Sequence, residues 1–196
     1  MITYWFKRLT DLAISLVLLP VALPLCAVLL VLIRLDSKGN PLFIQWRVGY
    51  RQAPFRLFKL RSMRTATGDH PSHEVSHVEL TRMGGWIRRT KLDELPQLLN
   101  VINGTMSLVG PRPCLIKQHH LIAERESLGL FEFRPGISGP AQLAGIDMSD
   151  PKKLAEAEAA YYPRANIIKD MTILIRTALG RGSGDAVLSS AHSVKE

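Results

Sequence analysis

Two adjacent carboxylates behind a run of cations form the segment best suited to chemistry. The segment reads Arg88-Arg89-Thr90-Lys91-Leu92-Asp93-Glu94-Leu95-Pro96-Gln97. An ionised carboxylate can act as a nucleophile, and Mg2+ can bridge neighbouring carboxylates to phosphate oxygens. Taken alone, the segment fits a plain helix cap with a solvated acidic first turn better than it fits a site. Asp93 and Glu94 are nevertheless the first candidates for catalysis and for holding a metal.

The apolar spacing that follows predicts the element that positions this carboxylate pair. Leu95, Leu98, Leu99 and Ile102 lie at i, i+3, i+4 and i+7, which predicts an amphipathic helix from near Asp93 to Asn103-Gly104. A helix amino terminus carries about half a positive charge and free N–H groups, so it favours phosphate and keeps a nearby carboxylate ionised.

Further cations occur in stiff turns. Val109-Gly110-Pro111-Arg112-Pro113 would hold one guanidinium in a fixed direction, and arginine contacts phosphate in a bidentate manner. Lys59-Leu60-Arg61-Ser62-Met63-Arg64 adds three cations, and Arg134-Pro135-Gly136-Ile137-Ser138-Gly139 is another rigid turn with one. In isolation, the first motif also fits an exposed proline-rich turn and the second a solvated strand end.

The remaining pattern predicts a small α+β domain. Residues 42–48 and 55–60 alternate as short strands, while 115–127, 151–161 and 166–179 are expected to be helices, the last with Ile167, Met171, Leu174 and Ala178 on one face. Residues 65–79 are predicted to form a mobile lid-like loop. His70, His73 and His77 in this loop have tempting zinc spacing, but Pro71 and the polar surroundings argue against a metal site.

An apolar segment near the amino terminus predicts a membrane anchor. The twenty-two residues from Leu12 to Ile33 carry no formal charge and would reach about 33 Å as a straight helix. Pro20 and Pro24 interrupt the run, and cations flank both ends, which favours a re-entrant hairpin with both ends on the cytoplasmic side. A single kinked transmembrane helix explains the residues about equally well.

The charge distribution indicates the partners. Residues 1–64 hold ten basic side chains against Asp11 and Asp36, which accounts for the whole net charge of +8. Because this excess borders the apolar segment, anionic lipids or anionic substrates are expected and nucleic acid is not. Cys26 and Cys114 lie in dissimilar surroundings without metal or redox spacing, so no disulfide is predicted and a reducing cytoplasmic face is the simpler interpretation.

In this order, the motifs closely resemble those of the monotopic phosphoglycosyl transferases, the bacterial sugar transferase family that starts glycan assembly on undecaprenyl phosphate. The likeness runs from the proline-interrupted segment through Lys59–Met63, Lys91–Gln97 and Ser107–Pro113 to Arg134–Gly139, nearly all of residues 1–180. Each motif is ordinary alone, but five in family order favour a functional interpretation. The resemblance is to a small member of the family.

The resemblance implies a mechanism for the carboxylate pair. Asp93 would attack the sugar-proximal phosphorus of a UDP-sugar, expel UMP and carry the sugar phosphate until undecaprenyl phosphate collects it. Glu94 would help ligate Mg2+, while Lys59, Arg88 and Arg112 would neutralise the phosphates. The hairpin of residues 1–36 would hold the catalytic domain of residues 37–180 at the cytoplasmic face of the inner membrane, and residues 181–196 would form a flexible polar tail.

The chain departs from the family pattern after Gly139. It continues Pro140-Ala141-Gln142-Leu143-Ala144-Gly145-Ile146, without the Asn and Arg that members often carry there. The departure leaves the sugar open, although small members suggest an N-acetylated amino sugar, and the oligomeric state is open too. The competing hypothesis is a non-catalytic membrane tether with a basic collar, against which the retention of both Asp93 and Glu94 beside three cations argues.

Overall fold

The computed structural model describes residues 2–63 and 80–180 and has an α+β fold of helices and short strands. The predicted loop 65–79, with His70, His73 and His77, and the predicted tail 181–196 lie outside these residues. In chain order the elements are α1 (Ile2–Asp36), β1 (Leu42–Val48), η1 (Tyr50–Gln52), β2 (Pro54–Leu60), α2 (Arg82–Arg89), η4 (Leu92–Glu94), α3 (Gln97–Ile102), β3 (Ser107–Val109), α4 (His119–Ser127), η5 (Leu130–Glu132), β4 (Gly136–Ser138), α5 (Pro140–Leu143), α6 (Pro151–Tyr161), η6 (Tyr162–Arg164) and α7 (Ile167–Ala178).

The long helix α1 presents one stripe to the rest of the protein. Its buried residues are spaced by four or seven, which places them on one helical face: Asp11, Ser15, Ala22, Leu29 and Ile33. Most of its other apolar side chains are exposed, with Val17 76% and Leu35 79% accessible. By length and composition, Trp5–Asp36 is able to cross a membrane. A long apolar helix with this exposure indicates membrane association.

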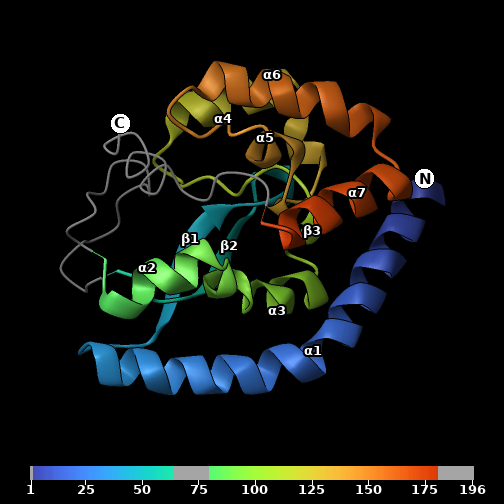
Figure 1. Cartoon of the computed structure of the whole chain (residues 1–196). Helices are drawn as coiled ribbons and strands as arrows, with labels where there is room; N and C mark the ends of the chain where they lie inside the picture. The colour runs from blue at the N-terminus through green and yellow to red at the C-terminus, as the bar shows by residue number, and fades with distance from the viewer. Residues whose placement is uncertain (1, 64–79, 181–196) are drawn as a thin grey trace, which may run out of the picture.

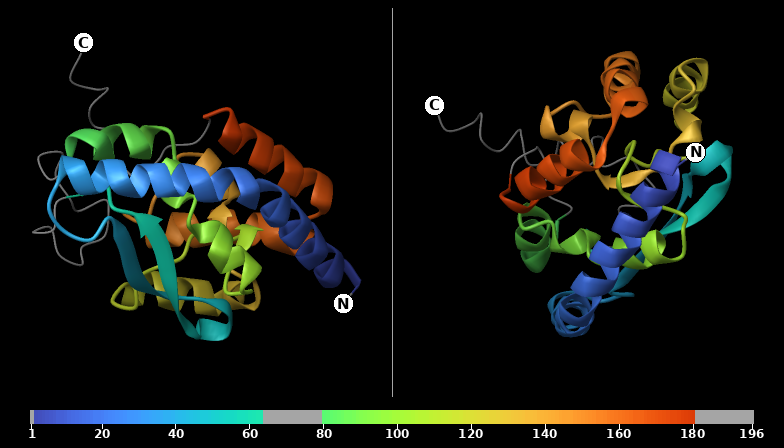
Figure 2. Two further views of the ribbon diagram at one scale, coloured as in Figure 1. Left: turned by 90° about the horizontal axis from the view of Figure 1, so that it is seen from below. Right: turned by 90° about the vertical axis from the view of Figure 1, so that its right-hand side faces the viewer.

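Pro20 and Pro24 lie inside α1 without dividing it into two helices. The ribbon of α1 nevertheless changes direction near its middle, so that its two halves follow different sides of the domain (Figure 1). The end-on view in Figure 2 shows the same change of direction. Both proline rings are exposed. The bend alone does not test the predicted re-entrant topology, which stays a prediction.

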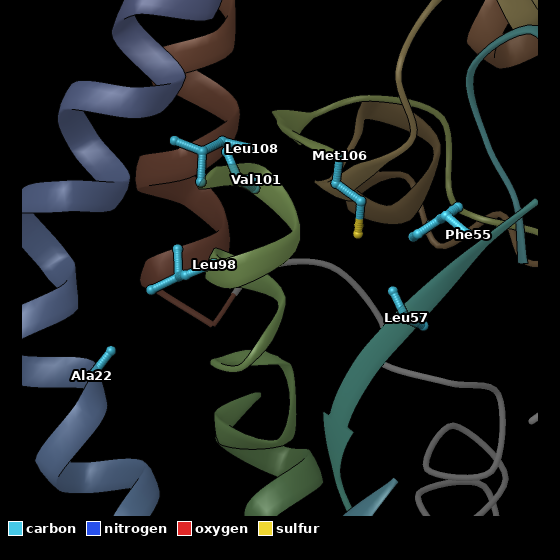
Figure 3. Close-up of a cluster of buried hydrophobic side chains, with 7 residues drawn as sticks. All are labelled: Ala22, Phe55, Leu57, Leu98, Val101, Met106 and Leu108. Carbon is cyan, nitrogen blue, oxygen red and sulfur yellow. The ribbon is translucent and has the colours of Figure 1, made fainter. Parts of the chain in front are cut away.

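Side chains from four elements form the core that joins α1 to the domain (Figure 3). Ala22 from α1, Phe55 and Leu57 from β2, and Leu98 from α3 pack together here. The remaining members are Val101, Met106 and Leu108. A second cluster joins Leu29 and Ile33 of α1 to Leu60 and Ile87. The core therefore fixes β2, α2 and α3 against α1.

Two separate two-stranded sheets support the domain. The predicted strands 42–48 and 55–60 are confirmed as β1 and β2, an antiparallel hairpin in which Leu42 faces Leu60 and Val48 faces Pro54. The second sheet pairs β3 and β4 in parallel. In this sheet Gly110 and Gly136 lie back to back, because a Cβ on Gly136 would come within 2.0 Å of the Gly110 nitrogen. Both proline-glycine motifs thus need glycine at this contact.

Helices α4 to α7 form a helical layer beside the second sheet (Figures 1 and 2). The predicted helix 151–161 is confirmed as α6, and 166–179 as α7 with Asn166 as its cap. The predicted helix 115–127 begins later, at His119, because the Gln118 side chain accepts the Leu115 N–H in a preceding turn. The buried face of α7 carries Asp170 and Ile173, offset from the predicted apolar face.

Candidate active site

Lys59 and the carboxylate pair meet at one point of the fold. Lys59 Nζ lies 3.0 Å from Glu94 Oε1 and 4.0 Å from Asp93 Oδ2. Asp93 is 5% exposed, while the side chains of Lys59 and Glu94 keep 15% and 19% of their surface accessible. The three predicted site residues therefore form one partly open cluster, built from β2 and from η4 thirty-odd residues later.

The predicted helix start at Asp93 is wrong in its detail. Asp93 lies in the short 3-10 turn η4, which follows the left-handed Lys91 (φ 57°), and the α-helix α3 begins only at Gln97. Pro96 has no N–H to donate to the Leu92 carbonyl, so the Leu95 N–H takes that carbonyl in a tighter i→i+3 bond of 3.3 Å. The site thus depends on the turn and its neighbours rather than on an α-helix amino terminus.

A buried asparagine places the carboxylate pair beside Lys59. Asn100 of α3 is fully buried; its Oδ1 accepts from Phe58 N at 3.1 Å, and its Nδ2 donates to Arg56 O at 2.8 Å. These two bonds dock α3 on the edge of β2, with Phe58 next to Lys59 in the chain. Sequence reasoning missed this residue, although a polar side chain within Leu98-Leu99-Asn100-Val101-Ile102 is a usable signal.

A buried ion pair holds the backbone of the turn that contains Arg112. Arg125 Nη2 lies 2.7 Å from Glu158 Oε1, and both residues are at most 2% exposed. Arg125 Nη1 also donates to Arg112 O at 2.7 Å, while Arg112 N donates to Glu158 Oε1 at 3.2 Å. Helices α4 and α6 therefore fix the backbone of Arg112, whose side chain is half-buried.

Lys91 is a cation of the site that the residue-by-residue assignment left out. Burial lowers the pKa of Lys91, the Glu94 carboxylate raises it and Arg112 lowers it again, so Lys91 lies within electrostatic reach of both residues. Lys91 has a left-handed backbone and lies two residues before Asp93. Its N–H donates to Arg88 O, and its carbonyl accepts the Glu94 N–H. A non-glycine residue with positive φ near two carboxylates is a signal that only the structure supplies.

The other cations of the predicted motifs, Arg88, Arg61 and Arg134, have different surroundings. Arg88 is buried in the last turn of α2, and its phosphate contact stays a prediction. Arg61 turns away from Lys59 and donates to Lys38 O at 2.8 Å and Ser37 O at 2.7 Å, which satisfies carbonyls at the end of α1. Arg134 Nε donates to Gly104 O at 2.7 Å. Arg61 and Arg134 therefore donate to backbone carbonyls that belong to the fold.

The carboxylate pair fits the ligation that Mg2+ prefers. Mg2+ is commonly bound by one or two carboxylates and completes its shell with substrate phosphates and water. Asp93 and Glu94 supply such a donor pair. Across residues 2–63 and 80–180, no group of three or more His, Cys, Asp or Glu side chains is placed to form a complete protein cage. A Mg2+ ion held by this pair would complete its shell with substrate oxygens or water.

Comparison with known proteins gives consistent matches over nearly the whole chain. The family model described as bacterial sugar transferase matches residues 2–181. An undecaprenyl-phosphate glucose phosphotransferase of Komagataeibacter xylinus is 42% identical over 147 residues, and a putative undecaprenyl-phosphate N-acetylgalactosaminyl 1-phosphate transferase of Bacillus subtilis is 44% identical over 109 residues. The exopolysaccharide production protein PSS of Rhizobium leguminosarum bv. phaseoli is 38% identical over 205 residues.

The matched shares differ among these relatives. The alignments cover 71%, 55% and 91% of this chain in the same order. They cover 28% and 61% of the first two relatives and 97% of the third. The chain is thus similar to part of the longer proteins and to almost all of the exopolysaccharide protein.

Proposed function

Because the chain belongs to the bacterial sugar transferase family, we propose that it moves a sugar 1-phosphate from a UDP-sugar to undecaprenyl phosphate and releases UMP. This reaction would be the first membrane step in the assembly of a glycan such as an O-antigen, a capsule or a glycoprotein sugar. The names of the relatives from K. xylinus and B. subtilis support the acceptor.

The observation that carries the proposal is the contact of Lys59 with both carboxylates. A lysine 3.0 Å from Glu94 and 4.0 Å from Asp93 places positive charge where an incoming diphosphate must approach the pair. Lys91 adds a further cation, whose pKa both Glu94 and Arg112 influence. Phosphoryl transfer depends on such positioned cations, since the protein has to stabilise charge on the phosphate oxygens.

Asp93 is the proposed nucleophile, and the transfer runs in two half-steps. An Asp93 oxygen bonds to the sugar-proximal phosphorus, the bond from this phosphorus to the bridging oxygen breaks, and UMP leaves with that electron pair. An oxygen of undecaprenyl phosphate then attacks the same phosphorus. The bond to Asp93 breaks in this second step, which restores the carboxylate and leaves the sugar diphosphate on the lipid.

The other residues bind and orient. Glu94 holds Asp93 and the substrate in place through Lys59, and Arg112 contacts a substrate phosphate from its braced turn, with Arg88 contributing a further charge. Asp93 and Glu94 would hold Mg2+. When bound, this ion supplies positive charge to the phosphate oxygens and the leaving UMP.

We infer that α1 places this site at the cytoplasmic face of the bacterial inner membrane. The apolar, exposed side of α1 fits lipid, and the cations before and after it favour a re-entrant hairpin with both ends on the cytoplasmic side. In this position a soluble UDP-sugar and a membrane-bound lipid phosphate both reach Asp93. The basic residues 1–64 would also attract anionic lipid.

An N-acetylated amino sugar is the proposed donor sugar class. The names of the relatives include both glucose and N-acetylgalactosamine, so the panel in a first assay must hold UDP-glucose and UDP-N-acetylgalactosamine. UMP release with one donor only would identify the sugar. A preference for UDP-glucose would reject the amino sugar and leave the reaction class intact.

The decisive experiment omits the lipid acceptor. Protein mixed with Mg2+ and the correct UDP-sugar should gain the mass of one sugar phosphate and release about one UMP per site. Asp93→Asn should do neither, whereas Glu94→Gln should slow the reaction without moving the label. UMP that appears only after both substrates bind would replace the covalent intermediate with direct transfer. A non-catalytic tether would release no UMP under any condition.

A further inference from the structure

A cavity of about 340 Å³ lies beside the amino-terminal part of α1, away from the carboxylate pair. Its walls come from α1, β3, the segment before β4, and the connection from α6 to α7. The volume falls within the about 300–1,000 Å³ typical of small-molecule pockets. Its cationic lining residues are Lys7, Arg8 and Arg134, and its apolar ones include Val109, Phe133 and Ala165.

Helix α3 separates this cavity from the active site. Its amino-terminal end follows Asp93 and Glu94, whereas its carboxyl-terminal carbonyls receive Arg8, with Arg8 Nη1 2.6 Å from Val101 O and Nη2 3.1 Å from Ile102 O. The six-residue helix is about 9 Å long at 1.5 Å per residue. The cavity and the carboxylate pair therefore lie at opposite ends of one helix.

The two carboxylates of the cavity already have internal partners. Asp170 accepts from Lys7 Nζ at 2.6 Å and from the Tyr161 hydroxyl at 2.8 Å. Asp11 accepts from the Ser107 hydroxyl at 2.7 Å. These carboxylates, both nearly fully buried, tie α1 to α7 and β3. Two acids thus neutralise at most two of the three cations that line the cavity.

The lining carries a net positive charge, because its three cations outnumber its two acids. Arg8 donates to backbone carbonyls, and the described part of the chain places no carboxylate within 4.0 Å of its guanidinium. Burial lowers the pKa of Arg134, so desolvation of this cation costs free energy that a bound anion would offset. The lining therefore combines excess positive charge with apolar walls.

Exposed apolar side chains surround the same cations on the membrane helix. Trp5, Phe6 and Leu9 of α1 are 57–65% exposed and flank Lys7 and Arg8 in the chain. Ile168 at the start of α7 is 79% exposed, two residues before Asp170. Aromatic residues and cations of this kind are typical of the membrane–water interface. A ligand in the cavity would meet lipid on one side and basic groups on the other.

We propose that this cavity binds an anionic phospholipid, with its phosphate between Arg8 and Arg134 and its first chain carbons against Val109, Phe133 and Ala165. The lipid would brace the contact of α1 with α7 and fix how deeply the helix sits in the membrane. This proposal rests on the proposed membrane position of α1 and does not depend on the transfer reaction.

The test measures lipid binding without any UDP-sugar. The delipidated, detergent-purified protein is titrated with short-chain phosphatidylglycerol and followed by native mass spectrometry, with phosphatidylcholine of the same chains, inorganic phosphate and a short polyprenyl phosphate as separate arms. We expect one phosphatidylglycerol per chain. Arg134→Gln should bind about tenfold more weakly, because a charge-assisted hydrogen bond is lost, and Arg134→Lys should recover part of the loss.

A cavity-filling variant and its matched control test the location. Ala165→Phe keeps every cation but fills the apolar wall, so it should abolish binding, whereas Ala160→Phe on the exposed side of α6 should bind as the native protein does. Thermal unfolding of both variants reports whether they fold. In the native protein, a photoreactive phosphatidylglycerol should label peptides from residues 5–11 or 162–170.

Four outcomes would remove the proposed site, and a fifth would change its ligand. The first four are native-like binding by Ala165→Phe, equal binding of phosphatidylcholine, saturation by inorganic phosphate alone, and labelling confined to other peptides. Tighter binding of the polyprenyl phosphate, lost in Ala165→Phe, would replace the phospholipid with the acceptor lipid. Failure of UMP release alongside intact lipid binding would reject the transferase function and leave this site in place.

Discussion

Arg125 holds the backbone of Arg112, with Nη1 donating to the Arg112 carbonyl oxygen over 2.7 Å. The same guanidinium pairs with Glu158, which accepts the Arg112 N–H in turn. The proposed phosphate-binding residue is therefore fixed by a buried acid and base that contact no substrate themselves. We therefore expect changes in the Arg125–Glu158 pair to affect both the stability of the α4–α6 layer and the proposed contact of Arg112 with the donor.

Glu158→Gln should destabilise the protein strongly. The change leaves the Arg125 charge buried without its counter-ion, and breaking a buried pair in this way costs about 3–5 kcal/mol. Thermal unfolding of the detergent-purified protein measures the loss. Glu156→Gln, on the exposed side of the same helix, is the matched control and should unfold like the native protein. Equal unfolding temperatures for the two variants would show that the pair contributes little.

Arg112→Lys should reduce turnover while the fold stays intact. Lysine keeps the charge but loses the planar fork that contacts two phosphate oxygens, so we expect a loss of about 1–3 kcal/mol in kcat/KM for UMP release. The backbone bonds to Arg125 and Glu158 do not involve the Arg112 side chain, and the unfolding temperature should therefore not move. Native activity in Arg112→Ala would make this turn a structural feature only.

Pro20→Leu/Pro24→Leu should convert α1 into a membrane-spanning helix. Leucine restores the backbone donors and removes the ring clashes, each proline costing about 3 kcal/mol in an ordinary helix interior. A tag before Met1 should then react with a membrane-impermeant reagent from outside the inner membrane, and the tag on the native protein should not. Labelling of the native amino terminus from outside would contradict the hairpin.

Local sequence patterns predicted the elements whose stabilising contacts are local. Neighbouring residues were enough to predict the strands at 42–48 and 55–60 and the boundaries of α6 and α7. They also placed Lys59 near the end of its strand. Pro96 is visible in the sequence, but only the structure shows the tight turn that precedes the helix at this proline. The result places Asp93 in η4 and not in α3.

Local sequence patterns did not predict contacts between distant segments. The parallel pairing of β3 with β4 joins strands of three residues each, too short for a periodic signal. No local pattern singles out Asp170, which is buried and pairs with Lys7, more than 160 residues earlier. The role of Asn100 likewise depends on its two hydrogen bonds to β2, a distant segment of the chain.

Lys91 should set the alkaline limit of the first half-reaction. Burial lowers its pKa, an effect that Glu94 opposes and Arg112 reinforces. The ammonium needed to bind the diphosphate is present below this pKa and is lost as the pH rises through it. The fall in kcat/KM for UMP release should therefore come below about 10.4, where an ordinary lysine titrates, since kcat/KM reports the free enzyme.

Arginine at this position provides the test. Lys91→Arg stays protonated far above the range in which lysine titrates, so its alkaline limb should move to higher pH, whereas Lys91→Met should lose that limb and show a lower rate at every pH. The positive φ of Lys91 is shared by all three proteins, so strain in the turn does not distinguish them. An alkaline limb at the same pH in the native protein and Lys91→Arg would assign it to another group and leave Lys91 as a residue of the turn.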